Sequence, residues 1–304
     1  MRTGQRGVAV VLAMGVVALA TIAATGILLL QSIWARQSEL LNERAQAAAM
    51  VDAGVDWVRA VLSDDRARSS VDHLGESWAL RMPPMPVERG ELTGNIEDQQ
   101  GLFNLNNLVQ DGKANMEQVA TFKRLLALLD LPGTLASALI DWMDADSAVE
   151  SEDGAEDEFY LALSLPYLAA NRSLTDVAEL ARVRGYDGAT RTRLRPFVTA
   201  LPGMTTINVN TARPEVLAAV VKGLDMASAR QIVAQRERTY FRDQADFVNR
   251  LPEGATVENS AIDVHSDYFQ TTLRVAIGEA QAECTALLGR TEAGWPAVAW
   301  RKYR

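Results

Sequence analysis

An uncharged apolar run near the N-terminus constrains the fold of this chain more than any other feature. Residues 8–30, VAVVLAMGVVALATIAATGILLL, contain no charged side chain. At about 1.5 Å of rise per residue, a helix of this length spans a hydrocarbon core of roughly 30 Å. Arg2 and Arg6 precede the run, so the positive-inside rule predicts a cytoplasmic N-terminus. We expect one membrane-spanning helix with the bulk of the chain beyond it.

The apolar run continues without a break into an amphipathic segment. Apolar residues recur there at spacings of three, four or seven: Trp34, Leu41, Ala45, Ala48, Val51, Val55, Val58 and Leu62. No proline occurs before Pro83. The pattern predicts one helix over residues 8–62, with its first part in lipid and its second part on a soluble domain. A secretory signal peptide cleaved at Ala18-Leu19-Ala20 is the alternative, but the apolar run extends ten residues past that point.

Residues 1–7 form a short basic leader that ends in Gly7, directly before the apolar run. This leader, the apolar segment and the continuous helix resemble the type IV pilin and pseudopilin family. The resemblance implies cleavage after Gly7 by a prepilin peptidase and N-methylation of Val8. Most members carry a glutamate five residues into the mature chain, where this sequence has Leu12. Without that glutamate a buried terminal amine goes unpaired, so we expect a subunit that caps a fibre.

Charge and motif content exclude several functional classes. The net charge of −9 disfavours nucleic acid as a partner, because phosphate binding depends on Lys and Arg. The single cysteine, Cys284, allows no disulfide framework and no Cys-based zinc site. The sequence holds only two histidines, His73 and His265, and no nucleophile elbow, phosphate loop or H-E-x-x-H pattern. We therefore expect no enzymatic activity.

The pattern in the soluble part predicts β-strands at both ends and a group of helices between them. Residues 63–90, with Pro83, Pro84 and Pro86, are expected to form a surface linker. Strand character is expected at 91–105, 268–277, 282–289 and 295–303, and helices at 116–129, 134–143, 173–183, 214–222, 227–238 and 243–248, with Thr134 as a helix cap. The predicted fold class is α+β, a pilin-like fold in which a long N-terminal helix packs on an antiparallel sheet, with a large inserted all-α domain.

The predicted domain boundaries follow from this order. After the leader (1–7) and the transmembrane part of the helix (8–30) come the first part of the pilin-like domain (31–112), the helical insert (113–255) and the second, β-strand part of the pilin-like domain (256–304).

The insert contains an internal repeat. FNLNN at residues 103–107 resembles INVNT at 207–211, and each copy precedes two helices. The second copy resembles a helix-hairpin-helix unit, whose turn here is Gly223-Leu224-Asp225. In nucleic-acid-binding members such a turn meets a phosphate through backbone N–H groups. The alternative function is therefore a membrane-anchored, competence-type DNA-binding protein, which the acidic charge and Asp225 oppose.

Residues 141–160, DWMDADSAVESEDGAEDEFY, contain nine carboxylates. Apolar and aromatic residues at both ends disfavour disorder, and so many like charges disfavour a poised acid–base pair. Hard oxygen ligands without nitrogen or sulfur favour one or two Ca²⁺ ions, and a solvated acidic loop stays the alternative. The candidate ligands are Asp141, Asp144, Asp146, Asp153, Glu156 and Asp157, whereas Glu150, Glu152 and Glu158 are expected to face solvent.

The order of the leader, DWMDAD, GAEDEFY, LSLPY and INVNTA resembles the type II secretion system minor pseudopilin K family, also called general secretion pathway protein K. The resemblance implies a single-pass inner-membrane protein with a periplasmic C-terminal domain. It implies a place at the pseudopilus tip, which serves export of folded proteins across the outer membrane. It also implies calcium binding by the insert and, as partners, minor pseudopilins I and J, then H and the major pseudopilin G. The expected partner contacts are Leu12, Ala13, Gly15, Trp34 and Leu41, among which the small residues Ala13 and Gly15 permit close helix approach.

Overall fold

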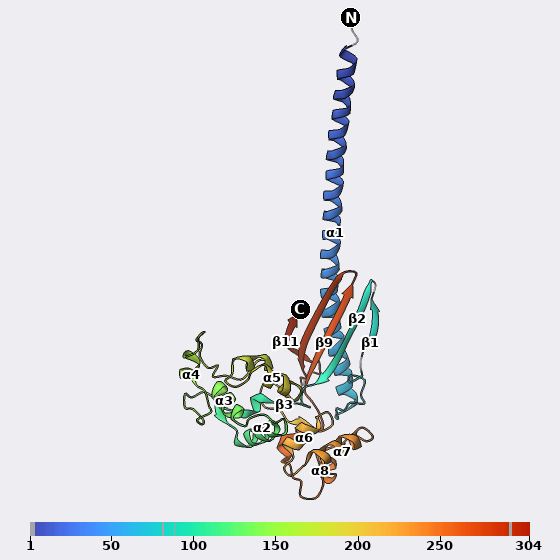
Figure 1. Cartoon of the computed structure of the whole chain (residues 1–304). Coiled ribbons are helices and arrows are strands. Elements are labelled where there is room, and N and C mark those ends of the chain that lie inside the picture. Colours follow the sequence, from blue (N-terminus) through green and yellow to red (C-terminus); the bar gives the residue numbers. More distant parts are fainter. Residues whose placement is uncertain (1–3, 81, 88, 292–293) are drawn as a thin grey trace.

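The computed structural model describes residues 4–80, 82–87, 89–291 and 294–304, so the first three residues of the predicted leader lie outside it. Helix α1 (Gly4–Arg68) is unbroken over 65 residues, which corresponds to a rod of about 98 Å. The predicted continuity is confirmed, although the helix begins before and ends after the expected 8–62. Among the described residues it is the one helix long and apolar enough to cross a membrane, with a mean hydropathy of 2.5 in its most apolar window. Figure 1 shows its first half standing clear of the rest of the chain.

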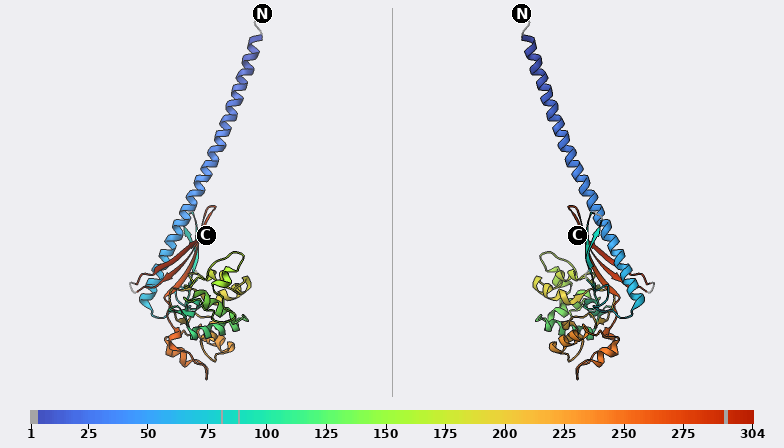
Figure 2. Two further views of the ribbon diagram at one scale, coloured as in Figure 1. Left: turned by 90° about the vertical axis from the view of Figure 1, so that its left-hand side faces the viewer. Right: turned by 90° about the vertical axis from the view of Figure 1, so that its right-hand side faces the viewer.

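The second half of α1 packs on one face of a five-stranded antiparallel sheet (Figure 2). The strand order is β1 (Met82–Val87), β2 (Gly90–Asp98), β9 (Tyr268–Ile277), β10 (Ala280–Gly289) and β11 (Ala297–Tyr303). Val51, Val55, Val58 and Leu62 are fully buried against it, as predicted, whereas Ala45 and Ala48 of the predicted apolar face are exposed and Ala47 is buried in their place. The helix and the sheet approach closely at Gly54, where a Cβ atom would lie 2.9 Å from Leu273 Cδ1. The α+β, pilin-like arrangement is thus confirmed.

Two expectations for the start of the sheet are wrong. The segment 63–90 is not only a surface linker: α1 continues to Arg68, and 82–87 form the edge strand β1 despite its three prolines. Proline has no N–H to donate, and an edge strand tolerates it because one side makes no ladder bonds. The predicted strand 91–105 ends at Asp98, and the short β3 (Phe103–Asn104) belongs to a different sheet.

Between β2 and β9 the chain forms the mainly helical insert. Its helices are α2 (Met116–Leu128), α3 (Thr134–Met143), α4 (Asp157–Leu161), α5 (Gly188–Leu194), α6 (Pro214–Val220), α7 (Met226–Arg236) and α8 (Gln244–Asn249). Its 3₁₀ helices are η1 (Leu105–Leu108), η2 (Val177–Arg182), η3 (Arg195–Phe197) and η4 (Asn259–Ala261). The helix expected at 173–183 is thus the 3₁₀ helix η2. Thr134 is the first residue of α3 rather than its cap, which is Gly133.

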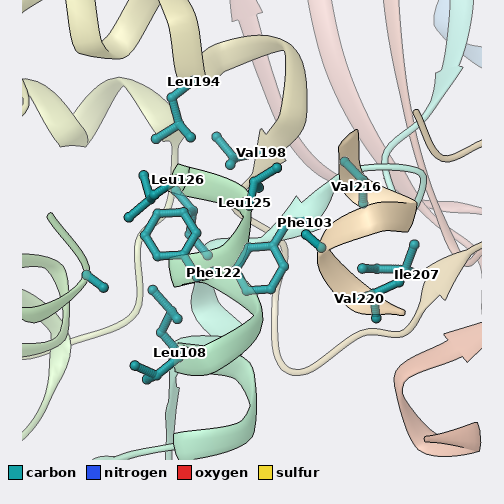
Figure 3. Packing of buried hydrophobic residues seen from close by; sticks show 14 of the residues in the cluster. Phe103, Leu108, Phe122, Leu125, Leu126, Leu194, Val198, Ile207, Val216 and Val220 are labelled. Atoms are coloured by element: carbon teal, nitrogen blue, oxygen red, sulfur yellow. The ribbon is translucent and has the colours of Figure 1, made fainter. Parts of the chain in front are cut away.

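The buried apolar residues form two separate clusters, one under α1 and the sheet and one inside the insert. The insert cluster runs from Phe103 to Val264, which is wider than the predicted 113–255. At its centre the rings of Phe103 and Phe122 stack with centroids 5.4 Å apart, and Figure 3 shows residues of α2, β3 and α6 meeting around them. A core of this kind supplies the main stabilisation of the insert, because burying apolar surface is the dominant favourable term.

The internal repeat has a structural counterpart. β3 pairs in parallel with β6 (Val198–Thr199), and β7 (Ile207–Asn208) pairs in parallel with β8 (Ile262–Asp263). Asn106 exchanges two hydrogen bonds with the backbone of Leu174, at 2.8 and 2.9 Å. Asn210, at the same place in the second copy, exchanges two with the backbone of Phe241, also at 2.8 and 2.9 Å. Each copy therefore closes its own unit by the same asparagine contact.

Candidate metal site and family

Several carboxylates of the acidic stretch 141–160 lie close together at the end of α3. Asp141 lies in the last turn of that helix, Asp144 follows it directly, and Glu156 precedes α4. These three side chains are buried, with exposed fractions of 0, 5 and 5 %. Asp144, Asp146 and Glu156 each offer a carboxylate oxygen within 4.8 Å of the others. Half of the six predicted ligands thus converge on one point.

Four oxygens of these buried carboxylates lack a hydrogen-bond donor. Asp141 Oδ2, Asp144 Oδ1 and both carboxylate oxygens of Glu156 are buried without a partner. Burial, followed by the charges of Asp141 and Asp144, raises the pKa of Glu156 to about 7. Burial, followed by the charge of Asp146, raises the pKa of Asp144 to about 6. Buried charges without partners are costly, and these oxygens form a set of ligands that suits a hard divalent cation.

Other predicted ligands lie differently. Asp141 Oδ1 accepts a bond from the Glu150 amide at 3.0 Å, which leaves only Oδ2 free. Asp157 Oδ1 accepts one from the Ala169 amide at 2.8 Å. Asp153 is exposed and outside the converging group, and the side chains of Glu150, Glu152 and Glu158 are exposed as expected.

The loop between α3 and α4 is held at both ends. The rings of Trp142 and Tyr160 meet edge to face with centroids 5.0 Å apart. Gly154 lies so close to Asp141 that a Cβ atom would overlap Asp141 Oδ2. Arg184 donates to the Gly154 carbonyl at 2.7 Å, and its guanidinium lies 4.7 Å from the centre of the Phe159 ring. The aromatic residues that bracket the stretch in the sequence therefore do anchor it.

A second group of carboxylates, missed by sequence reasoning, lies where α1 ends. Asp65, Asp72 and Glu76 come within the same 4.8 Å limit. Arg290 fills this place, with ion pairs of 2.6 Å to Asp65 and 2.7 Å to Asp72. The Arg290 guanidinium thus supplies the positive charge that a metal ion would supply to these carboxylates. No sequence signal links these residues, because more than two hundred positions separate Arg290 from its partners.

The hairpin turn at Gly223 does not present a phosphate site. Gly223 has a φ of +81°, and the side chain of Asp225 accepts a bond from the Ser228 amide at 2.7 Å as the cap of α7. A carboxylate thus occupies the helix N-terminus to which an anion would bind. This geometry disfavours the DNA-binding alternative.

Of the residues predicted for processing and partner contact, all but Leu41 lie on the free part of α1. Gly7, Val8, Leu12, Ala13 and Gly15 are exposed there, with no atom of another segment near the two glycines. Further along, the side chains of Trp34 and Leu41 are 73 and 64 % exposed, between the apolar run and the sheet.

The long helix and the antiparallel sheet on its distal half define a pilin-like subunit. Two sequence profiles described as type II secretion system (T2SS), protein K, match residues 101–203 and 207–265. A type II secretion system protein K from Pseudomonas aeruginosa is 39 % identical, over 97 % of this chain and 91 % of that protein. One from Klebsiella pneumoniae is 32 % identical, over 96 % and 95 %. The chain belongs to the type II secretion system protein K family, and its role is that of a minor pseudopilin.

A solved relative covers nearly the same extent. It is the crystal structure of the GspK-GspI-GspJ complex from the enterotoxigenic Escherichia coli type 2 secretion system. The match has a TM-score of 0.78 and 26 % identity, and it spans 88 % of this chain and 99 % of that one.

Proposed function

We propose that the chain is the tip subunit of a type II secretion pseudopilus, which starts and caps the fibre during export of folded proteins across the outer membrane. The observation that carries the assignment to a fibre is the form of α1, one rod that leaves the sheet and stands free over its first half (Figure 1). The apolar part anchors the chain in the inner membrane, and the sheet and the insert lie in the periplasm.

The free part of α1 supports helical partners. Trp34 lies on the free part of α1, and Leu41 lies where α1 first reaches the sheet, beside the ion pair of Glu39 with Arg89; both apolar side chains are exposed. Exposed apolar side chains one heptad apart lie on one side of a helix, where the apolar stripe of a second helix can pack against them. Minor pseudopilins I and J are the proposed cover, since the solved relative is a complex of GspK with GspI and GspJ. Within the membrane, the small residues Ala13 and Gly15 would allow close helix approach beside Leu12. The proposed subunits H and G lie lower in the fibre.

The capping role rests on the bulk of the insert and on Leu12. The insert lies beside the sheet on the side away from α1 and extends beyond the sheet's end, opposite to the direction in which α1 leaves it (Figure 2). A subunit stacked on that side would meet the insert. Leu12 removes the carboxylate that would neutralise the terminal amine of a further subunit, so growth is expected only beneath this chain.

Co-purification tests the partner assignment. The full chain would be extracted from membranes in detergent together with tagged I and J. Trp34→Asp with Leu41→Asp should lower recovery of I and J at least tenfold, because both charges would lie in the helix contact. Arg68→Ala, at the other end of α1, should leave recovery unchanged. Equal recovery from all three chains would rule out this face.

Processing is the second proposed property. The peptidase would cut after Gly7, and Val8 would then carry an N-methyl group. The intact mass of the mature chain should fall by residues 1–7 and rise by one methyl group. Gly7→Asp should leave the leader in place and abolish secretion. A mature chain that starts near Ala20 would support a signal peptide instead.

Calcium binding is the third proposed property. Asp141, Asp144, Asp146 and Glu156 would hold the ion, with Asp153 and Asp157 as further candidates on the second arm of the loop. The ion would supply the positive charge that the partnerless oxygens lack. Calorimetric titration should give binding that Asp144→Ala with Glu156→Ala removes and that Glu158→Ala, an exposed neighbour, leaves intact. Absence of heat in the parent chain would favour the solvated loop.

A further inference from the structure

The contact between the insert and the pilin-like body has a buried polar centre. The two apolar clusters are separate. The chain passes from the sheet into the insert after Asp98 and returns to it before Tyr268. Asp98, Asn208 and Ser266 meet at this crossing, together with Asp72 from the loop that follows α1. Directional hydrogen bonds fix an orientation more strictly than apolar contact does, because they weaken steeply with angle.

Asn208 reaches three segments of the body at once. It is fully buried, and its side-chain amide nitrogen lies 3.1 Å from the Asp72 carbonyl, 3.1 Å from Asp98 Oδ2 and 2.9 Å from Ser266 Oγ. Its backbone N–H donates to the Gln100 carbonyl at 2.9 Å. One residue of the insert thus contacts the loop after α1, the end of β2 and the approach to β9.

Asp98 is the acceptor at the centre. Its Oδ2 accepts bonds from Thr211 Oγ1, Ser266 Oγ and the Asn208 amide, and its Oδ1 accepts one from the Gln100 N–H. Arg290 pairs instead with Asp65 and Asp72. Burial raises the pKa of Asp98 to about 6, and the hydrogen bonds from Thr211 and Ser266 counteract part of that rise. Donors from the insert therefore help to hold a buried carboxylate of the body.

The internal repeat provides a matched comparison. Asn104 holds the place of Asn208 in the first copy and is equally buried. Its side-chain amide donates to the Gly203 carbonyl at 2.9 Å, and Asn107 and Thr205 lie at 3.2 Å. All these partners belong to the insert. The same residue type thus closes the insert in one copy and reaches out to the body in the other.

We propose that Asn208 is a positioning residue, which fixes the orientation of the insert on the pilin-like body through Asp72, Asp98 and Ser266. Other contacts between the two parts include hydrogen bonds from Thr199 Oγ1 to Gln99 at 3.1 Å and from Gln100 to the Thr206 carbonyl at 3.2 Å. They also include an exposed ion pair, Lys302 with Asp176, and the stacked rings of His73 and Tyr240. Solvent-exposed pairs contribute little and hold no strict geometry. The inference goes beyond the proposed capping function and does not depend on any partner.

Distances between spin labels test it on the full chain in lipid nanodiscs with calcium. Labels at Ala276→Cys on β9 and Arg230→Cys on α7, both exposed positions, report the angle between body and insert in a Cys284→Ala background. The parent should give one narrow distribution of distances between the two labels. Asn208→Ala should increase the width of that distribution at least twofold. Asn104→Ala should lower the melting temperature but keep the parent width.

Two further variants cover the case in which Asn208→Ala fails to fold. Asp98→Asn replaces one of two accepting oxygens with an NH2 donor, which must face either the Asn208 amide or the Gln100 N–H, and Ser266→Ala removes one acceptor, so both should broaden the distribution. Parent widths in these variants would overturn the proposal. So would equal broadening by Asn104→Ala, which would mean that general loosening of the insert is enough. Because I and J are absent from the sample, failure here leaves the capping function untouched.

Discussion

Removing the charge of Glu156 should change stability in opposite directions with and without calcium. Glu156 is 5 % exposed, and neither carboxylate oxygen has a hydrogen-bond partner. Burial raises its pKa from 4.5 to about 7, and the charges of Asp141 and Asp144 add to the rise. At about 1.4 kcal/mol per pKa unit, a shift of this size corresponds to roughly 3 kcal/mol.

The sign follows from the direction of the shift. The folded chain holds the Glu156 proton more tightly than the unfolded chain. This group therefore contributes stability below pH 4.5 and loses it as the pH rises through 7. Glu156→Gln carries no charge. In chelator it should be more stable than the parent by about 3 kcal/mol at pH 8 and about equal to it at pH 4. In calcium the variant lacks a ligand and should be the less stable chain.

Urea unfolding of the full chain in detergent micelles, followed by tryptophan fluorescence, would measure this. Trp142 packs edge to face on Tyr160 beside the site and reports its opening. Glu158→Gln, an exposed neighbour, is the matched control and should follow the parent in both buffers. A Glu156→Gln chain that gains nothing in chelator at pH 8, or that gains equally in calcium, would refute the reasoning.

Three further changes probe the loop and the core of the insert. Gly154→Ala should weaken calcium binding by titration, because its Cβ would overlap Asp141 Oδ2; unchanged affinity would mean that the loop relaxes freely. Asn115→Ala should lower the free energy of unfolding by about 1 kcal/mol, because the Asn115 side chain accepts from the Gln118 amide and caps α2. Equal urea unfolding of the parent and the variant would mean that this bond is not formed in solution. Phe122→Ala should cost about 3–5 kcal/mol by the same measurement, because the fully buried ring leaves a cavity beside Phe103, and a loss below 1 kcal/mol would contradict the packing.

The candidate site was only partly predictable. The residue types in 141–160 indicate oxygen ligands, and the aromatic residues at its ends indicate anchoring, because both properties are local. The convergence of Asp144, Asp146 and Glu156, and the engagement of Asp157 by the Ala169 amide, depend on how the loop folds back between α3 and α4. A spacing along the chain does not report which oxygens lack donors.

Strand β1 also combines a property that is local in the sequence with one that only the whole sheet sets. Three prolines in 82–87 correctly argue against a central strand, yet the segment pairs with β2 because it lies at the edge. Edge position is a property of the whole sheet. The partners of Asn208 are likewise remote, since Asp98 precedes it by 110 positions and Ser266 follows it by 58.

The sequence by itself determined the rod, its apolar first part, the α+β class and the repeated asparagine motif, because hydropathy and periodicity act between residues a few positions apart. Only the tertiary structure decided that Arg290 occupies the second carboxylate group, that Asn104 bonds within the insert and that Asn208 bonds to the body. These contacts join segments far apart in the chain, and burial, which sets their strength, exists only once the segments have packed.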